Sequence, residues 1–249
     1  RPPRSTLFPY TTLFRSASEI TPLVLDCDVE EPNCALYLKP EILSRTEVTV
    51  PVPSVSEEVC DSCGECGSFC QYHAIVSLRT KPLVFPDLCH GCGGCALVCP
   101  RGAITEAEKP IGHIEVGMSN GIVCRTGTLL VGQAMAAPLI KAVKRQEGGS
   151  ADPRLAGGTV PKPRAGNSLT IVDCPPGTAC PFRNAVMGAD YVILVTEPTP
   201  FGLHDLSLAA EAIGELGIPF GVVVNRMGTG DSRVQEYCAA RGISLIGEI

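Results

Sequence analysis

The sequence contains no apolar run long enough to cross a membrane. The stretch from Leu129 to Ile140 is interrupted by Gln133 and Pro138, whereas a spanning helix needs about 18 or more apolar residues. No charged segment followed by an apolar segment marks a secretory signal. Lys and Arg do not cluster, and the formal net charge is −6, which argues against nucleic acid or anionic membrane as the main partner. We therefore expect a soluble, cytoplasmic protein that meets small molecules or a small acidic protein.

The sequence also lacks a glycine-rich loop with a lysine for holding phosphate. The run from Pro22 to Asp28 has the pattern of a buried strand that ends in carboxylates, and in nucleotide enzymes such a loop usually lies nearby. None of the six lysines stands in a phosphate-loop context. The chain as written is therefore not expected to bind ATP productively.

From Leu169 onward, apolar strands alternate with helices. Strands are expected at 169–172, 191–195, 220–224 and 244–246, with helices ending near Met187, from Leu203 to Leu216 and from Ser232 to Arg241. Another helix is expected from Met135 to Arg145, and short strands between Gly112 and Thr128 around a turn at Ser119-Asn120-Gly121. This alternation predicts an α/β fold, a parallel sheet with helices on both faces.

Eight of the fourteen cysteines fall within 40 residues. Cys60, Cys63, Cys66 and Cys70 are repeated 29 residues later as Cys89, Cys92, Cys95 and Cys99, so the segment is an internal duplication. In the spacing C-x2-C-x2-C-x3-C, three thiolates surround one corner of a cuboidal iron-sulfur cluster, and the fourth points to the other cluster. The intervening glycines permit tight turns and leave N–H groups free to bond the sulfurs. The spacing predicts two 4Fe–4S clusters.

Two zinc sites are the main alternative for these cysteines. Zinc sites usually pair two C-x2-C units across a longer loop, whereas here four thiolates occupy eleven residues, twice. Iron-sulfur is therefore favoured. The remaining cysteines are expected to be buried, inert thiols, and of these only the pair flanking a loop, Cys174 and Cys180, merits attention: Cys27, Cys34, Cys124, Cys174, Cys180 and Cys238. The four histidines share no spacing with carboxylates and receive no role.

Residues 56–109 resemble the bacterial two-cluster ferredoxin domain. The resemblance implies that ligands cross over between the motifs: Cys60, Cys63, Cys66 and Cys99 for one cluster, and Cys89, Cys92, Cys95 and Cys70 for the other. Pro100 follows Cys99 as in that family, but Gln71 takes the place of the proline after Cys70.

The motifs "LVLDCDVEEPN", "VDCPPGT", "VTEPTPFGLHDL" and "VVVNR" resemble the MinD-type deviant P-loop ATPases that carry an inserted two-cluster ferredoxin domain. The resemblance implies an ATPase domain from 17–55 and 110–249 that binds ATP and Mg²⁺ and works as a homodimer. By matching motifs, Asp28 orients the attacking water with support from Asp26, Asp173 lies on the magnesium side, and Asn225 contacts adenine. Gly177 brings its N–H to a terminal phosphate.

Residues 1–16 do not fit this domain. The stretch "LFPYTTLFRS" resembles a translated sequencing adapter, so we expect residues up to about Ser16 to be assembly debris and the phosphate loop to have been lost upstream. The alternative is a natural, divergent N-terminus. The chain also stops directly after an expected strand, which suggests truncation there too.

The sequence thus predicts an iron-sulfur protein that transfers electrons to a redox protein partner, with the parent protein coupling this transfer to ATP hydrolysis. Two rivals stay open. One is a plain electron carrier on an inactive ATPase scaffold, and the other is a scaffold that assembles and hands on clusters. Eight ligands in the ferredoxin arrangement argue for permanent clusters and against the assembly scaffold.

Overall fold

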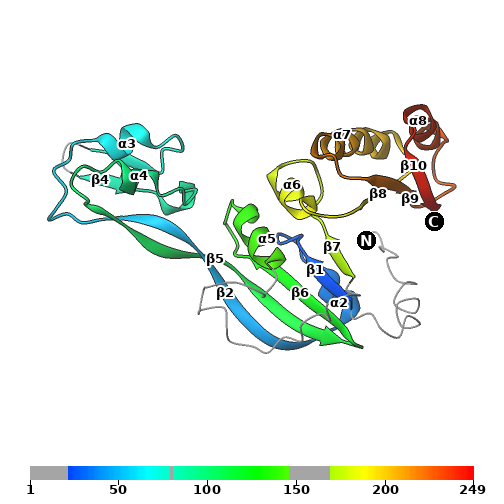
Figure 1. The fold of residues 1–249 in the computed structure, drawn as a ribbon, viewed down its shortest axis with the longest axis horizontal. Coiled ribbons are helices and arrows are strands. Elements are labelled where there is room, and N and C mark those ends of the chain that lie inside the picture. The colour runs from blue at the N-terminus through cyan, green and yellow to red at the C-terminus, as the bar shows by residue number, and fades with distance from the viewer. Residues whose placement is uncertain (1–21, 79–80, 146–168) are drawn as a thin grey trace. The chain divides into compact units, whose positions relative to one another are not determined.

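The computed structural model describes residues 22–78, 81–145 and 169–249, so the interpretation of residues 1–16 lies outside the described residues. The chain divides into two compact units with a boundary between Ile171 and Val172, inside strand β7 (Thr170–Asp173). Each unit combines strands and helices, which confirms the α/β class (Figure 1).

The first unit is built on a mixed sheet with the strand order β2-β5-β6-β1-β7. Strand β1 (Leu23–Asp26) pairs in parallel with β6 (Ile122–Leu129). Strands β2 (Glu41–Val55), β5 (Ile104–Ser119) and β6 are antiparallel neighbours. The sheet is mixed because β5 and β6 form a hairpin at the expected turn, where Asn120 and Gly121 both have positive φ as a type I′ turn requires.

Helix α5 (Ala136–Lys144) packs on this sheet at two glycines, and the short helix α2 (Cys34–Leu38) follows β1. A Cβ on Gly127 would stand 2.6 Å from Val143 Cγ2, and one on Gly112 would stand 2.7 Å from Leu139 Cδ2. Both helix residues are fully buried. The absence of side chains at Gly112 and Gly127 therefore allows α5 to lie close against β5 and β6.

Strands β2 and β5 continue beyond β6 as a two-stranded ribbon. Strand β6 ends its pairing at Gly112, whereas β2 and β5 stay paired as far as Val55 and Ile104. The chain between these two residues carries all eight clustered cysteines, and Figure 1 shows both strands running into it. The cysteine-rich segment is thus connected to the sheet by adjacent, paired strands.

The cysteine-rich segment contains only short elements. These are helix α3 (Glu65–Phe69), strands β3 (Ile75–Ser77) and β4 (Pro82–Val84), the 3₁₀ turn η1 (Pro86–Leu88) and helix α4 (Gly94–Leu97). Its small core consists of Val52, Cys66, Ala74, Ile75, Cys89 and Ile104. Two of these six residues are motif cysteines, so the segment has little apolar core of its own.

The second unit has a three-stranded parallel sheet in the order β10-β9-β8. The strands are β8 (Val192–Thr196), β9 (Phe220–Val224) and β10 (Ser244–Glu248), and the helices are α6 (Cys180–Val186), α7 (Pro200–Leu216) and α8 (Arg233–Arg241). Val222 and Val224 of β9 pack with Ile213 of α7 and Val234 of α8 in one core. The alternation expected after Leu169 is confirmed, with element ends shifted by a few residues.

Candidate iron-sulfur sites

Two cavities lie in the cysteine-rich segment, and each has four motif cysteines in its wall. The larger, of about 470 Å³, is lined by Cys70, Cys89, Cys92 and Cys95. The smaller is lined by Cys60, Cys63, Cys66 and Cys99. Each cavity thus receives three cysteines from one motif and the last cysteine of the other.

The backbone repeats the duplication seen in the sequence. Positive φ angles recur at the same 29-residue offset, at Ser62 and Gly91, Gly64 and Gly93, and His73 and Gly102. Helices α3 and α4 begin at equivalent positions, Glu65 and Gly94.

Two equivalent hydrogen bonds also join the two halves of the duplication. Ser56 N donates to Ala103 O at 2.8 Å, and Phe85 N donates to Ala74 O at 2.7 Å. The donors Ser56 and Phe85 are 29 residues apart, as are the acceptors Ala74 and Ala103, so each half makes the same bond to the other. The two halves are therefore related by an approximate twofold exchange.

Backbone N–H groups point at motif sulfurs. Ala103 N donates to Cys99 Sγ at 3.3 Å, and Gly91 N donates to Cys89 Sγ at 3.4 Å. At Cys70, burial acts to raise the pKa, but N–H groups of the residues that follow outweigh it and the pKa falls below its usual value. Such donors stabilise thiolate charge, which is the form of cysteine that binds metal.

Burial has the opposite effect at Cys66 and Cys95. Removal from water raises the pKa of both thiols, since nothing nearby compensates fully for the lost hydration of the charged form. A bound metal reverses this balance, because its positive charge deprotonates a coordinating thiol. The donor set of each cavity, four cysteines in a partly apolar wall with N–H donors, fits a 4Fe–4S cluster.

The carboxylates of the first strand lie in the first unit. Asp26 is fully buried, and its Oδ2 accepts a hydrogen bond from Cys34 N at 3.0 Å, so it holds the start of α2. Asp28 is half-buried in the loop after β1. The supporting role of Asp26 and the catalytic role of Asp28 both stay predictions.

The other residues assigned to nucleotide binding lie in the second unit. Asp173 ends β7, Gly177 follows in a turn with φ of +86°, and Asn225 follows β9. The Asn225 side-chain oxygen accepts from Arg226 N at 2.9 Å, and Arg226 forms an ion pair with Glu197 at 2.8 Å. The common site that the sequence predicts for these residues and Asp28 stays a prediction.

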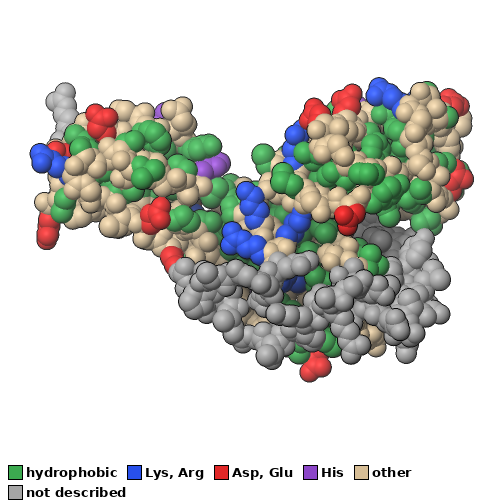
Figure 2. All heavy atoms as spheres, in the orientation of Figure 1, with side chains coloured by type: hydrophobic (Ala, Val, Ile, Leu, Met, Phe, Trp, Pro, Cys, Tyr) green, Lys and Arg blue, Asp and Glu red, His purple; other side chains and the backbone are tan. Residues whose placement is uncertain are grey.

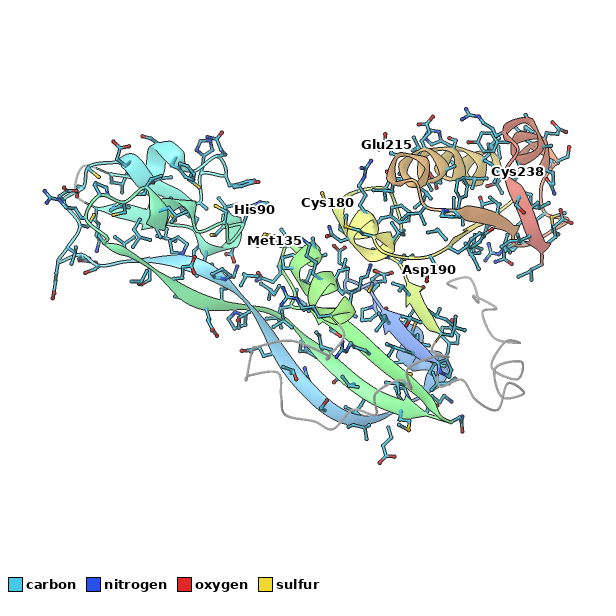
Figure 3. The ribbon with its side chains drawn as sticks, viewed as in Figure 1. His90, Met135, Cys180, Asp190, Glu215 and Cys238 are labelled. Carbon is cyan, nitrogen blue, oxygen red and sulfur yellow. The ribbon has the colours of Figure 1, made fainter. Side chains whose placement is uncertain are left out.

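The remaining cysteines differ in exposure. Cys27, Cys124 and Cys238 are buried, as expected for inert thiols, and burial raises the pKa of Cys124 to about 11. Cys34 and Cys174 are half-buried, and Cys180 is exposed at the start of α6 (Figure 3). The expected burial is thus confirmed for the first three and wrong for Cys180, while their inertness stays a prediction.

Four side chains in the cavity walls were not singled out from the sequence. Asp61 and Arg101 line the smaller cavity, and their side chains form an ion pair with a Nε–Oδ2 distance of 2.7 Å. Tyr72 and His90 line the larger cavity, and their rings stack with centroids 3.6 Å apart. Figure 3 shows His90 in the loop before α4. The 29-residue repeat relates position 61 to 90 and position 72 to 101, so the sequence shows that the two pairs are equivalent but does not show that their members are in contact.

Comparison with known proteins gives two relatives. The chain is 30% identical over 214 residues to the uncharacterized protein MJ0579 of Methanocaldococcus jannaschii, covering 85% of this chain and 71% of that protein. It is also 30% identical over 212 residues to the uncharacterized protein MJ0578 of the same organism, with 85% and 70% covered. The chain belongs to the family of these two proteins. Residues 82–105 of this chain match the model of the 4Fe-4S binding domain, and this range contains the second cysteine motif.

Solved structures give weaker likenesses. One is the septum site-determining protein MinD of Pyrococcus horikoshii, complexed with Mg-ADP, at 14% identity and a TM-score of 0.44. The alignment covers 92% of this chain and 68% of the MinD chain. A plasmid partition protein of Borrelia burgdorferi aligns with 96% and 79%, at 10% identity and a TM-score of 0.40. These values are too low to assign function. Among the described residues, no helix is long and apolar enough to cross a membrane.

Proposed function

We propose that this protein holds two 4Fe–4S clusters and passes single electrons to and from a redox protein partner. Cys60, Cys63, Cys66 and Cys99 would hold one cluster, and Cys70, Cys89, Cys92 and Cys95 the other. The observation that carries the proposal is the sorting of eight cysteines into two cavity walls in this crossed arrangement. Each cluster would supply reversible one-electron chemistry.

The surroundings of the cysteines support this chemistry. Ile75 and Ile104 are buried between the halves and pack against Cys70, Cys95 and Cys99, which restricts the access of water. N–H donors at Cys89 and Cys99 favour the thiolate form. Acidic side chains are scattered over the visible face of the segment rather than gathered in one patch (Figure 2).

Anaerobic reconstitution with iron and sulfide tests the proposal. We expect about eight iron and eight sulfide per chain, and a dithionite-reduced EPR spectrum of two interacting 4Fe–4S clusters. Cys63→Ala should lose about half of the iron, because it removes one ligand of one site. Cys180→Ala is the matched control, since it removes an exposed cysteine outside the motifs and should lose none. Failure to bind iron and sulfide, together with binding of two zinc ions per chain when zinc is supplied instead, would overturn the proposal.

We further propose that the natural gene product couples these clusters to ATP. Asp26, Asp28, Asp173, Gly177 and Asn225 match the nucleotide motifs quoted above, but a complete site also needs a phosphate loop that the printed sequence lacks. Such a protein would work in the cytoplasm as a homodimer.

Calorimetric titration of Mg–ATP into the natural gene product tests the coupling. Binding that Asp173→Ala weakens at least tenfold supports it, because that change removes the carboxylate on the magnesium side. If ATP leaves the reduction potentials of the clusters unchanged, the natural product would instead be a plain electron carrier.

A further inference from the structure

Each cavity contains one pair of side chains that joins the two cysteine motifs. At the smaller cavity, Asp61 follows Cys60 of the first motif and Arg101 follows Cys99 of the second by two residues. At the larger cavity, His90 follows Cys89 of the second motif and Tyr72 follows Cys70 of the first by two residues. Each pair therefore links the loop that supplies three cysteines to the segment that supplies the fourth.

The two pairs occupy equivalent positions in the duplication. At the 29-residue offset, Asp61 corresponds to His90 and Tyr72 corresponds to Arg101. Both sites therefore have a side-chain contact at this position, but the type of interaction differs. One pair is an ion pair with a Nε–Oδ2 distance of 2.7 Å, and the other is a ring stack with an interplanar angle of 14°.

The ion pair also fixes a ligand loop. Asp61 Oδ2 accepts from Arg101 Nε, while Asp61 Oδ1 accepts from Cys63 N at 3.2 Å. One carboxylate thus holds the turn that carries Cys63 and ties it to the segment of Cys99. At the other site, the Gly91 N–H bond to Cys89 Sγ fixes the equivalent turn, and the rings of Tyr72 and His90 make the tie.

We propose that Asp61–Arg101 and Tyr72–His90 are equivalent clamps, each holding the fourth cysteine of its site against the other three. Their different chemistry makes the Cys60 site sensitive to salt and the Cys89 site insensitive. These are positioning residues, because they act through the cysteines. The inference rests on the proposed two-cluster ligation.

The expected magnitudes follow from the exposure of the pairs. The side chains of Arg101 and Asp61 are 62% and 38% exposed, so salt screens their attraction, with a Debye length of about 10 Å at 0.1 M and about 3 Å at 1 M. We expect the loss of an exposed ion pair of this kind to change the rate of iron release roughly two- to fivefold. A stacked aromatic pair corresponds to roughly a two- to tenfold effect, and added salt does not weaken contact between apolar surfaces.

The experiment follows chelator-driven iron release from the anaerobically reconstituted chain at about 0.05 M and about 1 M NaCl. In the unmodified protein we expect two equal phases, of which one accelerates with salt. Arg101→Gln should accelerate that phase roughly two- to fivefold at low salt and abolish its salt dependence. Tyr72→Ala should accelerate only the other phase, and Tyr72→Phe should restore it because the ring is kept.

Matched variants separate a clamp from a general loss of stability. Glu57→Gln breaks another exposed ion pair of the same segment, Lys81–Glu57, whose side chains are 56% and 69% exposed and line neither cavity, and should change neither phase. The exchange Asp61→Arg with Arg101→Asp should restore the salt dependence that Arg101→Gln abolishes, while the acceptor for Cys63 N stays lost. Equal acceleration of both phases by Arg101→Gln, or no change in either, would overturn the clamps. Failure of the unmodified chain to hold two clusters would instead overturn the proposed function.

Discussion

Cys124 illustrates how burial alone sets the chemistry of one residue. Its side chain lies in β6, 3% exposed, and desolvation raises the thiol pKa to about 11. Thiolate is the reactive form, so this cysteine should resist alkylation, whereas Cys180 is exposed. We predict that iodoacetamide at about pH 8 modifies Cys180 of the cluster-loaded protein first and leaves Cys124 unmodified until the protein unfolds, as peptide mass spectrometry would show.

The same shift has a stability consequence with a definite sign. A pKa raised on folding means that the native state keeps a proton which the unfolded chain releases. The stability that this thiol contributes is therefore complete below about pH 9 and is lost as the pH rises toward about 11. Equal labelling of Cys124 and Cys180 in the native protein would contradict both statements.

Gly94 shows why one residue type is required between the two halves. A Cβ placed on Gly94 would stand 2.1 Å from Phe69 Cε1, so α4 approaches the Phe69 ring without a side chain between them. We predict that Gly94→Ala lowers the free energy of unfolding of the cysteine-rich segment by about 1 kcal/mol, the low end for overpacking, because the Phe69 ring is 46% exposed and has room to turn away. Urea unfolding followed by the visible absorbance of the clusters measures this, and adding Phe69→Leu should recover part of the loss.

At the scale of single residues, most residues of the candidate sites could be predicted from the sequence. The eight cysteines and their duplication are legible because ligand spacing is local. Asp61, Arg101, Tyr72 and His90 were harder to find, since neither an ion pair nor a ring stack has a fixed spacing along the chain. Only the three-dimensional exchange of the two motifs brings these residues together.

At the scale of elements, glycine has opposite effects in two places. Gly127 in β6 faces α5, and a Cβ there would stand 2.6 Å from Val143 Cγ2 and 2.8 Å from Val29 Cγ1. Gly214 lies exposed in the last turns of α7, and a Cβ there would meet nothing within 4 Å. The first glycine is needed for packing, while the second only lowers helix propensity.

Alanine substitution should therefore change stability in opposite directions at these two positions. We predict that Gly127→Ala destabilises the first unit by roughly 1–3 kcal/mol because α5 is pushed off the sheet. Gly214→Ala should stabilise the second unit by roughly 0.5–1 kcal/mol, since alanine loses less backbone entropy in a helix. Hydrogen exchange resolved by unit measures both effects, and a loss of stability from Gly214→Ala would contradict the helix argument.

Strand β2 is the longest element that the sequence did not predict. Its segment contains Pro51 and Pro53, which argue against a strand unless it lies at a sheet edge. The structure has β2 at the edge of the five-stranded sheet, paired only with β5. Its partner residues lie up to 77 positions away, as in Glu41 opposite Met118, so no local pattern signals the pairing. The α/β repeats from Leu169 onward were predictable because each strand there lies next to its own helix in the chain.

At the scale of the whole molecule, the parts differ in how much apolar core each has. The second unit buries twelve residues in one cluster, from Phe182 to Cys238. The cysteine-rich segment has a few buried residues in two small clusters, and motif cysteines are among them. A segment of this size usually needs metal or disulfide links to stay folded.

Removal of the clusters should therefore unfold one part and spare the other. We predict that chelation under anaerobic conditions abolishes hydrogen-exchange protection between Ser56 and Ala103, because the bonds that join the two halves, such as Ser56 N to Ala103 O, depend on ligands that hold both motifs. Protection in α7 and β9 should stay unchanged, since the core they share contains no motif cysteine. Iron repletion should restore the lost protection. Retention of protection in the cysteine-rich segment after complete iron loss would show that its small apolar core is sufficient, and that the clusters serve electron transfer without supporting the fold.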